Sequence, residues 1–358
     1  MRAAARVSRA ASAALEAVGL DPGLAARVQT DTRGLDAAVG ALARADGRRG
    51  AADLWTRVAE RALALQHALA AAAAPERRLE LDAAGVLERR FLAPLRVLGD
   101  ARRGVTIAGR LAVQTPTPLH RELLAAATGD RPLAAWAAGR EPAAARDELQ
   151  AWGLPAQLVA AGPMRRPPSL APAGARISLR GVRVVELGGL WAAPLAAQLL
   201  RELGAEVVKV EAPSRPDGAR RGPRSHFLAL NAGKRMLALD LRREAERARL
   251  EALLGPETIV IENFTGRVLG NLGLPPERIL HTGAALVRMP ASRERPDDRA
   301  LGSLVELAGG LGLEDACAPL PFTDALSGAT AALQAVAALC GPRARTVGQI
   351  EDVAGALR

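Results

Sequence analysis

The sequence predicts an α/β fold, a Rossmann-like parallel sheet with flanking helices, preceded by a mainly helical N-terminal region. From about residue 179 onward, short apolar runs of the strand type alternate with helical segments, a pattern typical of a parallel sheet. In the first half, apolar residues recur at helical spacing, and the run from Trp55 to Ala74 contains no helix breaker. A proline-rich segment lies between the two patterns.

Three segments are therefore expected along the chain. Residues 1–161 form a mainly helical region, residues 162–178 a linker, and residues 179–358 the Rossmann-like domain. The linker is predicted because its density of proline disfavours regular structure. Within the first segment, regular elements are expected as one or two strands around 104–114 and as helices at 118–128 and 141–152.

Four apolar runs in the second half are expected to be strands of the sheet. They are residues 182–187, 207–211, 258–261 and 284–288. Gly188 and Gly189 follow the first run directly, and an apolar helix then runs from Trp191 to the stop at Gly204. A strand–turn–helix unit of this kind brings backbone N–H groups and a helix N-terminus to the edge where α/β proteins bind phosphates. A buried helix is expected at 325–339, which is apolar nearly all round.

Composition limits the classes of partner. The chain has 358 residues, 49% hydrophobic and 24% charged, as globular proteins do, and a net charge of +10, which favours an anionic partner. It has four Phe and no Tyr, so base-stacking aromatics are scarce and no nucleic acid partner is expected. No apolar run reaches the ~20 residues of a membrane span, so a cytoplasmic protein without membrane contact is expected. Cys317 and Cys340 fit neither a zinc spacing nor a disulfide framework, so no metal is expected.

A dinucleotide site is one interpretation of the first strand–turn–helix unit. Gly188 and Gly189 form the turn, and Glu211 ends the second strand, where an acid accepts ribose hydroxyls. The full G-x-G-x-x-G is missing, however, and Pro194 stands where a third glycine is needed. NAD(P) binding therefore remains an alternative.

A second set of motifs covers the same residues more fully. In chain order they are Trp191-Ala192-Ala193-Pro194, Gly204-Ala205-Glu206-Val207-Val208-Lys209-Val210-Glu211, Asn231-Ala232-Gly233-Lys234-Arg235 with Leu239-Asp240, and Glu262-Asn263-Phe264 with Leu272-Gly273. In this order they resemble the family III CoA-transferases, the formyl-CoA and carnitine CoA-transferase type. The resemblance implies an enzyme that transfers CoA from an acyl-CoA donor to a carboxylic acid acceptor.

Asp324 is the catalytic candidate that the resemblance implies. It lies in Phe322–Gly328, where the family places an Asp at the start of a buried helix with a Gly four residues later. The Asp forms a mixed anhydride with the acyl group and then an aspartyl-CoA thioester, from which CoA passes to the acceptor. A helix N-terminus stabilises its charge, and nearby N–H groups can hold an oxyanion. The local sequence alone also fits a plain N-cap Asp.

CoA, as substrate and product, is expected at the carboxyl edge of the sheet. Its phosphates require cations, and the Arg residues of loop 213–224 stand beyond the end of a strand. The residues that match CoA-contacting positions or supply charge are Trp191, Ala192, Lys209, Lys234, Arg235, Leu239, Arg242, Asn263, Phe264 and Thr265. Other interpretations are a solvated turn for Lys234 and Arg235, an N-cap for Asn263 and a core position for Phe264. The resemblance also implies a homodimer, which is interlocked in the family.

Several positions depart from the family pattern. Ala212 replaces a basic residue, Asn271 replaces an Arg, and residues 289–293 replace a glycine-rich loop. These changes favour the alternative of an inactive CoA-binding subunit, whereas Asp324 favours an enzyme. Acyl-CoA racemases of the same family need a His before the Asp. Residues 290–313 contain none, so racemisation is disfavoured.

The layout of the chain differs as well. Family members continue past the Asp into a small helical domain, whereas this sequence ends soon after Asp324. Residues 100–160 resemble that small domain through Trp136 and the run 152–155. We therefore expect a rearranged member whose small domain precedes the large one, with cleavage near Pro167 releasing two stable pieces.

Overall fold

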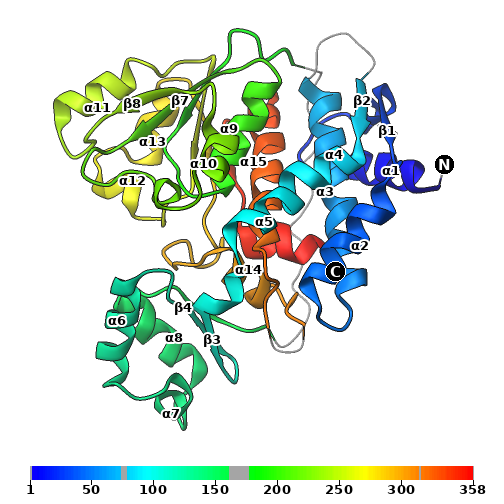
Figure 1. Cartoon of the computed structure of the whole chain (residues 1–358). Helices are drawn as coiled ribbons and strands as arrows, with labels where there is room; N and C mark the ends of the chain where they lie inside the picture. Colours follow the sequence, from blue (N-terminus) through cyan, green and yellow to red (C-terminus); the bar gives the residue numbers. More distant parts are fainter. Residues whose placement is uncertain (1, 74–78, 161–176, 314–315, 358) are drawn as a thin grey trace.

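A computed structural model describes residues 2–73, 79–160, 177–313 and 316–357. A six-stranded sheet, parallel throughout, is the centre of the second half (Figure 1). Its strands are β6 (Arg183–Glu186), β7 (Glu206–Glu211), β8 (Arg235–Ala238), β9 (Thr258–Glu262), β10 (Ala285–Arg288) and β11 (Ala344–Thr346), in the order β11-β10-β9-β6-β7-β8. The order reverses beside β6, and in such sheets ligands bind at the carboxyl ends of the strands flanking that point.

The four predicted strands are confirmed as β6, β7, β9 and β10. The sequence did not predict β8, which is an edge strand with mostly exposed side chains, or β11, which has three residues. Neither strand has the length or the apolar pattern that marks a buried strand. The expected linker at 162–178 lies almost entirely outside the described residues.

Helices cover both faces of the sheet. On one face α9 (Ala192–Glu202) packs against α15 (Phe322–Cys340), the buried helix predicted from the sequence. Gly328 permits this packing, because a Cβ there would lie 2.7 Å from the carbonyl oxygen of Ala192. The helices of the other face and of the β7–β8 connection are α10 (Arg224–Asn231), α11 (Glu244–Glu251), α12 (Val268–Asn271) and α13 (Pro276–His281), with the 3-10 turn η4 (Gly218–Arg221).

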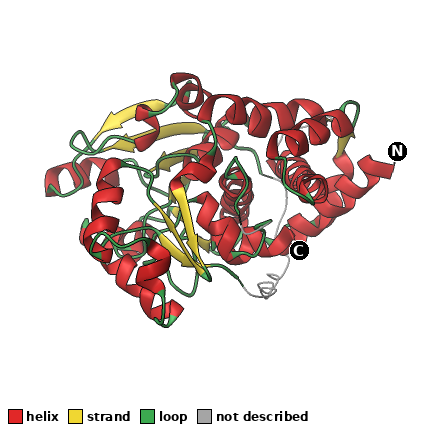
Figure 2. Ribbon diagram, turned by 60° about the horizontal axis from the view of Figure 1, so that its bottom comes forward, coloured by secondary structure: helices red, strands yellow, loops and turns green. Residues whose placement is uncertain are grey.

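The N-terminal helices extend the core of the sheet. The long helix α3 (Ala51–Ala73) packs on α15, and the rings of Trp55 and Phe322 meet edge to face at 5.4 Å. The other elements of this layer are α1 (Arg2–Ala17), η1 (Pro22–Arg27), β1 (Val28–Asp31), α2 (Leu35–Asp46), β2 (Leu79–Asp82), α4 (Ala83–Leu87), η2 (Glu88–Leu92), α5 (Ala93–Leu98) and η3 (Ala101–Gly104). Both ends of the chain lie on this side of the molecule (Figure 2). The C-terminal turns are η5 (Gln349–Ala354) and η6 (Gly355–Leu357).

A small lobe contains residues 105–158. The antiparallel strands β3 (Val105–Ala108), β4 (Leu111–Gln114) and β5 (Ala156–Leu158) pack with α6 (Pro118–Thr128), α7 (Leu133–Ala137) and α8 (Pro142–Ala151) around a core that contains Trp136. The lobe contacts the rest of the chain through α14 (Gly302–Ala308), which packs on β4 and β5. Gln150 adds hydrogen bonds to the backbone of Arg299.

The core boundaries differ from the expected division at residue 161. The N-terminal helices share one hydrophobic cluster with α9, α15 and one face of the sheet, whereas most of the buried apolar residues of 105–158 form their own cluster. The sequence predicted one mainly helical region over residues 1–161 and likened only residues 100–160 to a small domain. The first hundred residues of this region belong to the same core as the sheet, because α1 and α3 bury their apolar faces against it.

Candidate active site

Asp324 lies in the first turn of α15, at the carboxyl edge of the sheet. Helix α15 connects two parallel strands, β10 and β11, so it runs antiparallel to them and begins where they end. Helix α9, which follows β6, begins at the same edge. Gly328 sits one turn after Asp324 and touches Ala192 at the start of α9. The candidate carboxylate and the turn after β6 therefore lie at the N-terminal ends of two adjacent helices.

The Asp324 carboxylate is largely buried and has one polar contact from the backbone. The Gly302 N–H donates a hydrogen bond to it. Burial raises the pKa of Asp324 from 3.8 to about 7, although the Gly302 hydrogen bond acts to lower it. No charged side chain in the described part of the chain contributes to this shift. Asp324 therefore exchanges its proton near neutral pH, as a carboxyl group used in catalysis does.

The turn after β6 is held from two sides. The Asn263 side chain accepts the N–H of Gly189 and donates to the Gly189 carbonyl, each at 3.0 Å. Asp217 accepts the N–H of Leu190 at 2.8 Å, and Leu190 adopts a φ of +67°, a conformation rare for a residue with a side chain. Two side chains from later loops therefore fix a strained turn beside the start of α9, and strain of this kind collects at functional sites.

Lys209 and Lys234 lie in a buried ion cluster behind this turn. The Lys209 ammonium contacts Glu186 at 2.5 Å, Asp217 at 2.9 Å and the carbonyl of Gly188 at 3.0 Å. Lys234 contacts Glu186 at 2.6 Å and two further oxygens, those of Pro194 and Asn231.

Both lysine side chains are fully buried, and an ammonium has only three N–H groups to donate. Burial acts to lower the pKa of Lys209, but Glu186 and Asp217 outweigh it and raise the pKa. For Lys234 burial prevails and lowers the pKa to about 8. Each ammonium is surrounded by oxygens of the protein, so both lysines belong to the interior of this edge, and their contact with CoA stays a prediction.

Three of the predicted contact residues lie in or near the second hydrophobic core of the sheet. Leu239 is fully buried in the core beneath the sheet, so it cannot touch a ligand, which corrects that prediction. Phe264 is partly buried against the same core, as one interpretation of the sequence held. Thr265 follows it in the turn after β9. That turn is anchored by Glu262, which accepts the Phe264 N–H at 2.6 Å and Arg288 at 2.8 Å.

The remaining predicted contact residues lie along the carboxyl edge or on the outer strand. Trp191 caps α9, and its ring meets His226 edge to face at 5.0 Å. Ala192 begins α9 and is buried. Arg235 is exposed on β8. Arg242 is exposed but forms a bidentate pair with Asp240 at 2.8 Å.

The arginines of loop 213–224 divide into bound and unbound groups. Arg220 donates hydrogen bonds to both carboxylate oxygens of Glu211, at 2.8 and 3.0 Å. Because these oxygens are already paired, Glu211 is poorly placed to accept the ribose hydroxyls of a dinucleotide. Arg215, Arg221 and Arg224 are exposed, and no ion pair of theirs occurs within the described residues. These three supply free positive charge close to the carboxyl edge.

Sequence reasoning missed three residues of this edge. Glu186 ends the first strand, Asp217 lies in the arginine loop, and Gly302 begins α14. The sequence contained a signal for Glu186, because an acid at the end of a buried strand requires a cationic or hydrogen-bonding partner. No local pattern marks Asp217 or Gly302, whose partners Lys209 and Asp324 lie on other elements of the fold.

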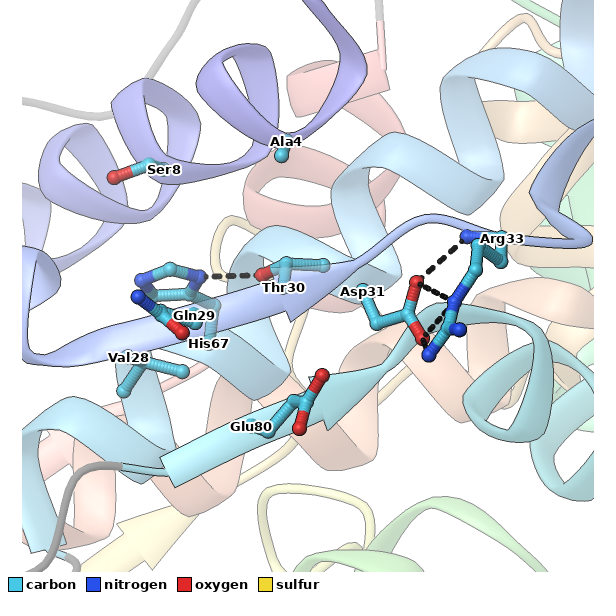
Figure 3. A pocket seen from close by; sticks show the side chains of 9 residues that line it. All are labelled: Ala4, Ser8, Val28, Gln29, Thr30, Asp31, Arg33, His67 and Glu80. Atoms are coloured by element: carbon cyan, nitrogen blue, oxygen red, sulfur yellow. Dashed lines mark hydrogen bonds and ion pairs between the residues drawn. The ribbon is translucent and has the colours of Figure 1, made fainter. Parts of the chain in front are cut away.

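Two cavities lined by described residues lie away from the carboxyl edge. One, of about 500 Å³, lies between α1 and the β1–β2 pair (Figure 3). On its wall Thr30 contacts the buried His67 at 2.9 Å, and burial lowers the pKa of His67. A second, of about 280 Å³, lies in the small lobe. Neither is lined by a predicted site residue.

Metal sites and membrane spans have no candidate in the described ranges. Among those residues, no group of three or more His, Cys, Asp or Glu is arranged to hold a metal. Within the same ranges, none of the helices combines the length and the apolar character that a membrane span requires.

Comparisons with known proteins relate part of the chain to enzymes that act on CoA thioesters. Residues 179–292 match the family described as CoA-transferase family III. The chain is 31% identical to the succinyl-CoA–D-citramalate CoA-transferase of Chloroflexus aurantiacus, over 49% of this chain and 48% of that protein. It is 34% identical to the succinate–glutarate CoA-transferase of Agrobacterium fabrum, over 33% of this chain and 30% of that protein. With the alpha-methylacyl-CoA racemase of Mus musculus it shares 39% identity, over 30% of this chain and 26% of that protein.

The chain thus spans half or less of the length of the relatives named here, and Asp324 lies beyond the segment matched to the family. That segment includes β6 to β10 and the turns that form the carboxyl edge. The resemblance that the motifs predicted is confirmed, and through residues 179–292 this chain is a relative of CoA-transferase family III.

Proposed function

We propose that the chain transfers CoA from an acyl-CoA to a carboxylic acid, with Asp324 as the carboxylate that accepts the acyl group. The observation that carries the proposal is the place of Asp324: at a helix N-terminus, beside the turn after β6, with a pKa raised to about 7. Asp324 lies C-terminal to the segment, residues 179–292, that matches a family of CoA-transferases.

The chemistry balances with one carboxylate. An Asp324 oxygen attacks the thioester carbonyl carbon, the C–S bond breaks, and a mixed anhydride and CoA thiolate form. The thiolate attacks the aspartyl carbonyl and releases the donor acid, which leaves an aspartyl-CoA thioester. The acceptor carboxylate then displaces the thiolate from Asp324, and the thiolate attacks the acceptor acyl group. The products are the new acyl-CoA and free Asp324.

The other groups of the edge are assigned to binding. Arg215, Arg221 and Arg224 contact the phosphates of CoA, and the turn at residues 188–191 directs the thioester toward Asp324. A basic, exposed loop beside a buried carboxyl suits a ligand with an anionic end and a thiol end. The acceptor pocket is assigned to the small lobe, which packs on α14 next to Asp324. The homodimer, the linker at 162–178 and the cytoplasmic location stay predictions.

A trapping experiment tests the proposal. The full chain is incubated with succinyl-, formyl- and acetyl-CoA, and the products are treated with hydroxylamine or borohydride and mapped by mass spectrometry. We expect an adduct at Asp324 and none in Asp324→Asn. CoA binding without an adduct for any donor would support the inactive-subunit alternative instead. Absence of CoA binding would refute both.

Racemisation is the second candidate, because a racemase is among the relatives. The same incubation in deuterium oxide separates the two activities: a racemase exchanges the α-hydrogen of 2-methylacyl-CoA without an acceptor acid, whereas a CoA-transferase needs the acceptor. We expect acceptor-dependent transfer and no exchange.

A further inference from the structure

Thr323 is a buried polar residue directly before Asp324, and its hydroxyl pairs with a backbone group of another helix. Its side chain is fully buried, and its hydroxyl donates to the Gly302 carbonyl oxygen at 2.8 Å. A buried hydroxyl without a partner costs free energy, so this hydrogen bond fixes how α15 meets α14.

Gly302 is a glycine for a steric reason. A Cβ at this position would lie 2.3 Å from Oδ2 of Asp324 and 2.8 Å from the Cβ of Pro321, distances that no real contact reaches. Glycine is also the residue whose backbone dihedral angles are the least restricted. At the first position of α14, such a residue benefits from a further contact that fixes the direction of its N–H.

Two hydrogen bonds act on Gly302, the first residue of α14. Its N–H donates to the Asp324 carboxylate, and its carbonyl accepts from Thr323. Thr323 and Asp324 are neighbours in the first turn of α15. The turn that contains the Asp324 carboxylate therefore also restrains Gly302, whose N–H donates to that carboxylate.

We infer that Thr323 is a positioning residue: it restrains Gly302 so that the Gly302 N–H holds one carboxylate oxygen of Asp324 and leaves the other free to attack. The inference rests on the proposed function for its catalytic meaning. The restraint itself concerns only Thr323, Gly302 and Asp324, and it is measurable in the resting protein.

The restraint has a consequence for the proton affinity of Asp324. An N–H that donates to a carboxylate favours the charged form and lowers its pKa, so a loosened Gly302 raises the pKa of Asp324 above its value of about 7. Among the described residues, no charged side chain contributes to the pKa shift of Asp324, although several lie on the elements packed against α15. Asp324 is the only Asp, Glu, Lys or Arg on α15, α14 has only Glu306, and α9 has Arg201 and Glu202 in its last turn. The charged or titratable residues of the other contacting elements are Asp53, Arg57, Glu60, Arg61 and His67 on α3, Glu88, Arg89 and Arg90 on η2, Arg288 on β10, Arg345 on β11, and Glu351 and Asp352 on η5.

The test compares three substitutions on one helix. Thr323→Val removes the hydroxyl with little change in volume, and Thr323→Ser keeps it. Thr330→Val is the matched control, because the Thr330 hydroxyl is also buried on α15 but has no hydrogen-bond partner among the described residues. The pKa of Asp324 is measured by carbon-13 NMR of labelled aspartate, with Asp324→Asn to assign the signal. The kcat and KM for an acyl-CoA are measured in parallel.

We expect Thr323→Val to raise the pKa of Asp324 and to lower kcat about tenfold or more with KM unchanged, as a misplaced reacting group does. Thr323→Ser and Thr330→Val should match the parent protein. If Thr323→Val fails to fold, Thr323→Cys repeats the test, since a thiol is a weak donor. An unchanged pKa and kcat in a folded Thr323 variant would overturn the inference while leaving CoA transfer intact. Full activity of Asp324→Asn would overturn the proposed function, and the NMR measurement would still decide the restraint.

Discussion

Two groups of buried carboxyls lie at the carboxyl edge of one sheet, and they differ in what surrounds them. Glu186 and Asp217 face the ammonium groups of Lys209 and Lys234 at 2.5 to 2.9 Å. Asp324 has a backbone N–H and no cation. A buried charge that is paired becomes part of the framework, whereas an unpaired one holds its proton more tightly and can react near neutral pH. The difference separates a structural cluster from a chemical site within the same edge.

The largest expected effect is a loss of stability when an ammonium is removed from the buried ion cluster of Glu186 and Asp217. Lys209→Met leaves Glu186 and Asp217 with one ammonium between them. We expect the free energy of unfolding to fall by about 3–5 kcal/mol, the usual result of removing one partner of a buried ion pair. Urea denaturation measures it. Arg249→Met is the control, since the exposed pair of Arg249 with Glu246 is worth less than about 1 kcal/mol. Similar losses in both variants would mean that the cluster is not a framework element.

A smaller effect, on kcat, is expected when the Asp324 carboxylate is displaced. Gly302→Ala introduces a Cβ where Oδ2 of Asp324 lies 2.3 Å away, so the carboxylate must move. We expect kcat to fall about 100-fold, the cost of misplacing a reacting group by about 1 Å. Gly270→Ala on α12 is the matched control, because a Cβ there meets nothing within 4 Å. Normal turnover of Gly302→Ala would show that the position of Asp324 does not limit the reaction.

Glu306 is an intermediate case that sharpens the comparison. It is fully buried on α14, with the Ala318 N–H at 2.7 Å and Arg48 at 3.5 Å. Burial raises its pKa from 4.5 to about 8, although Arg48 acts to lower it. Because the folded protein binds this proton more tightly than the unfolded chain, the stabilisation is full below about pH 4.5 and is lost as pH rises through about 8.

Glu306→Gln should therefore flatten the pH dependence of stability. We expect the parent protein to lose more unfolding free energy than the variant between pH 5 and pH 9, since glutamine has no proton to lose. Urea unfolding of both proteins at the two pH values measures the difference. Parallel curves would place the Glu306 pKa near its ordinary value and remove it from the comparison.

The smallest effect is expected from the exposed cations of the loop. Arg221→Ala combined with Arg224→Ala removes two exposed charges assigned to CoA phosphates. We expect KM for acyl-CoA to rise up to about tenfold, less at high salt because solvent and ions screen such contacts, and kcat to stay constant. Arg249→Ala is the charge control. An unchanged KM at low salt would assign the phosphates to other residues.

The predicted strands and helices were found where the local pattern was strong. Val184 and Val260 lie in short apolar runs next to turn residues, and Gly328 was marked as part of the helix that follows Asp324. The motifs also led to the family, because they combine residue type with chain order over β6 to β10. The edge strand β8 escaped prediction because its side chains are mostly exposed and show no apolar period.

The sequence alone determined that a parallel sheet occupies the second half, that glycines follow its first strand, and that an Asp stands at the start of an apolar helix. Only the tertiary structure decided what the charged residues do. Lys209 and Asp324 are each a single charged residue in an apolar run, yet one is enclosed by acids and the other is not. Proton affinity depends on partners within a few ångströms, and those partners, Glu186 for Lys209 and Gly302 for Asp324, lie on other elements that only the folded chain brings together.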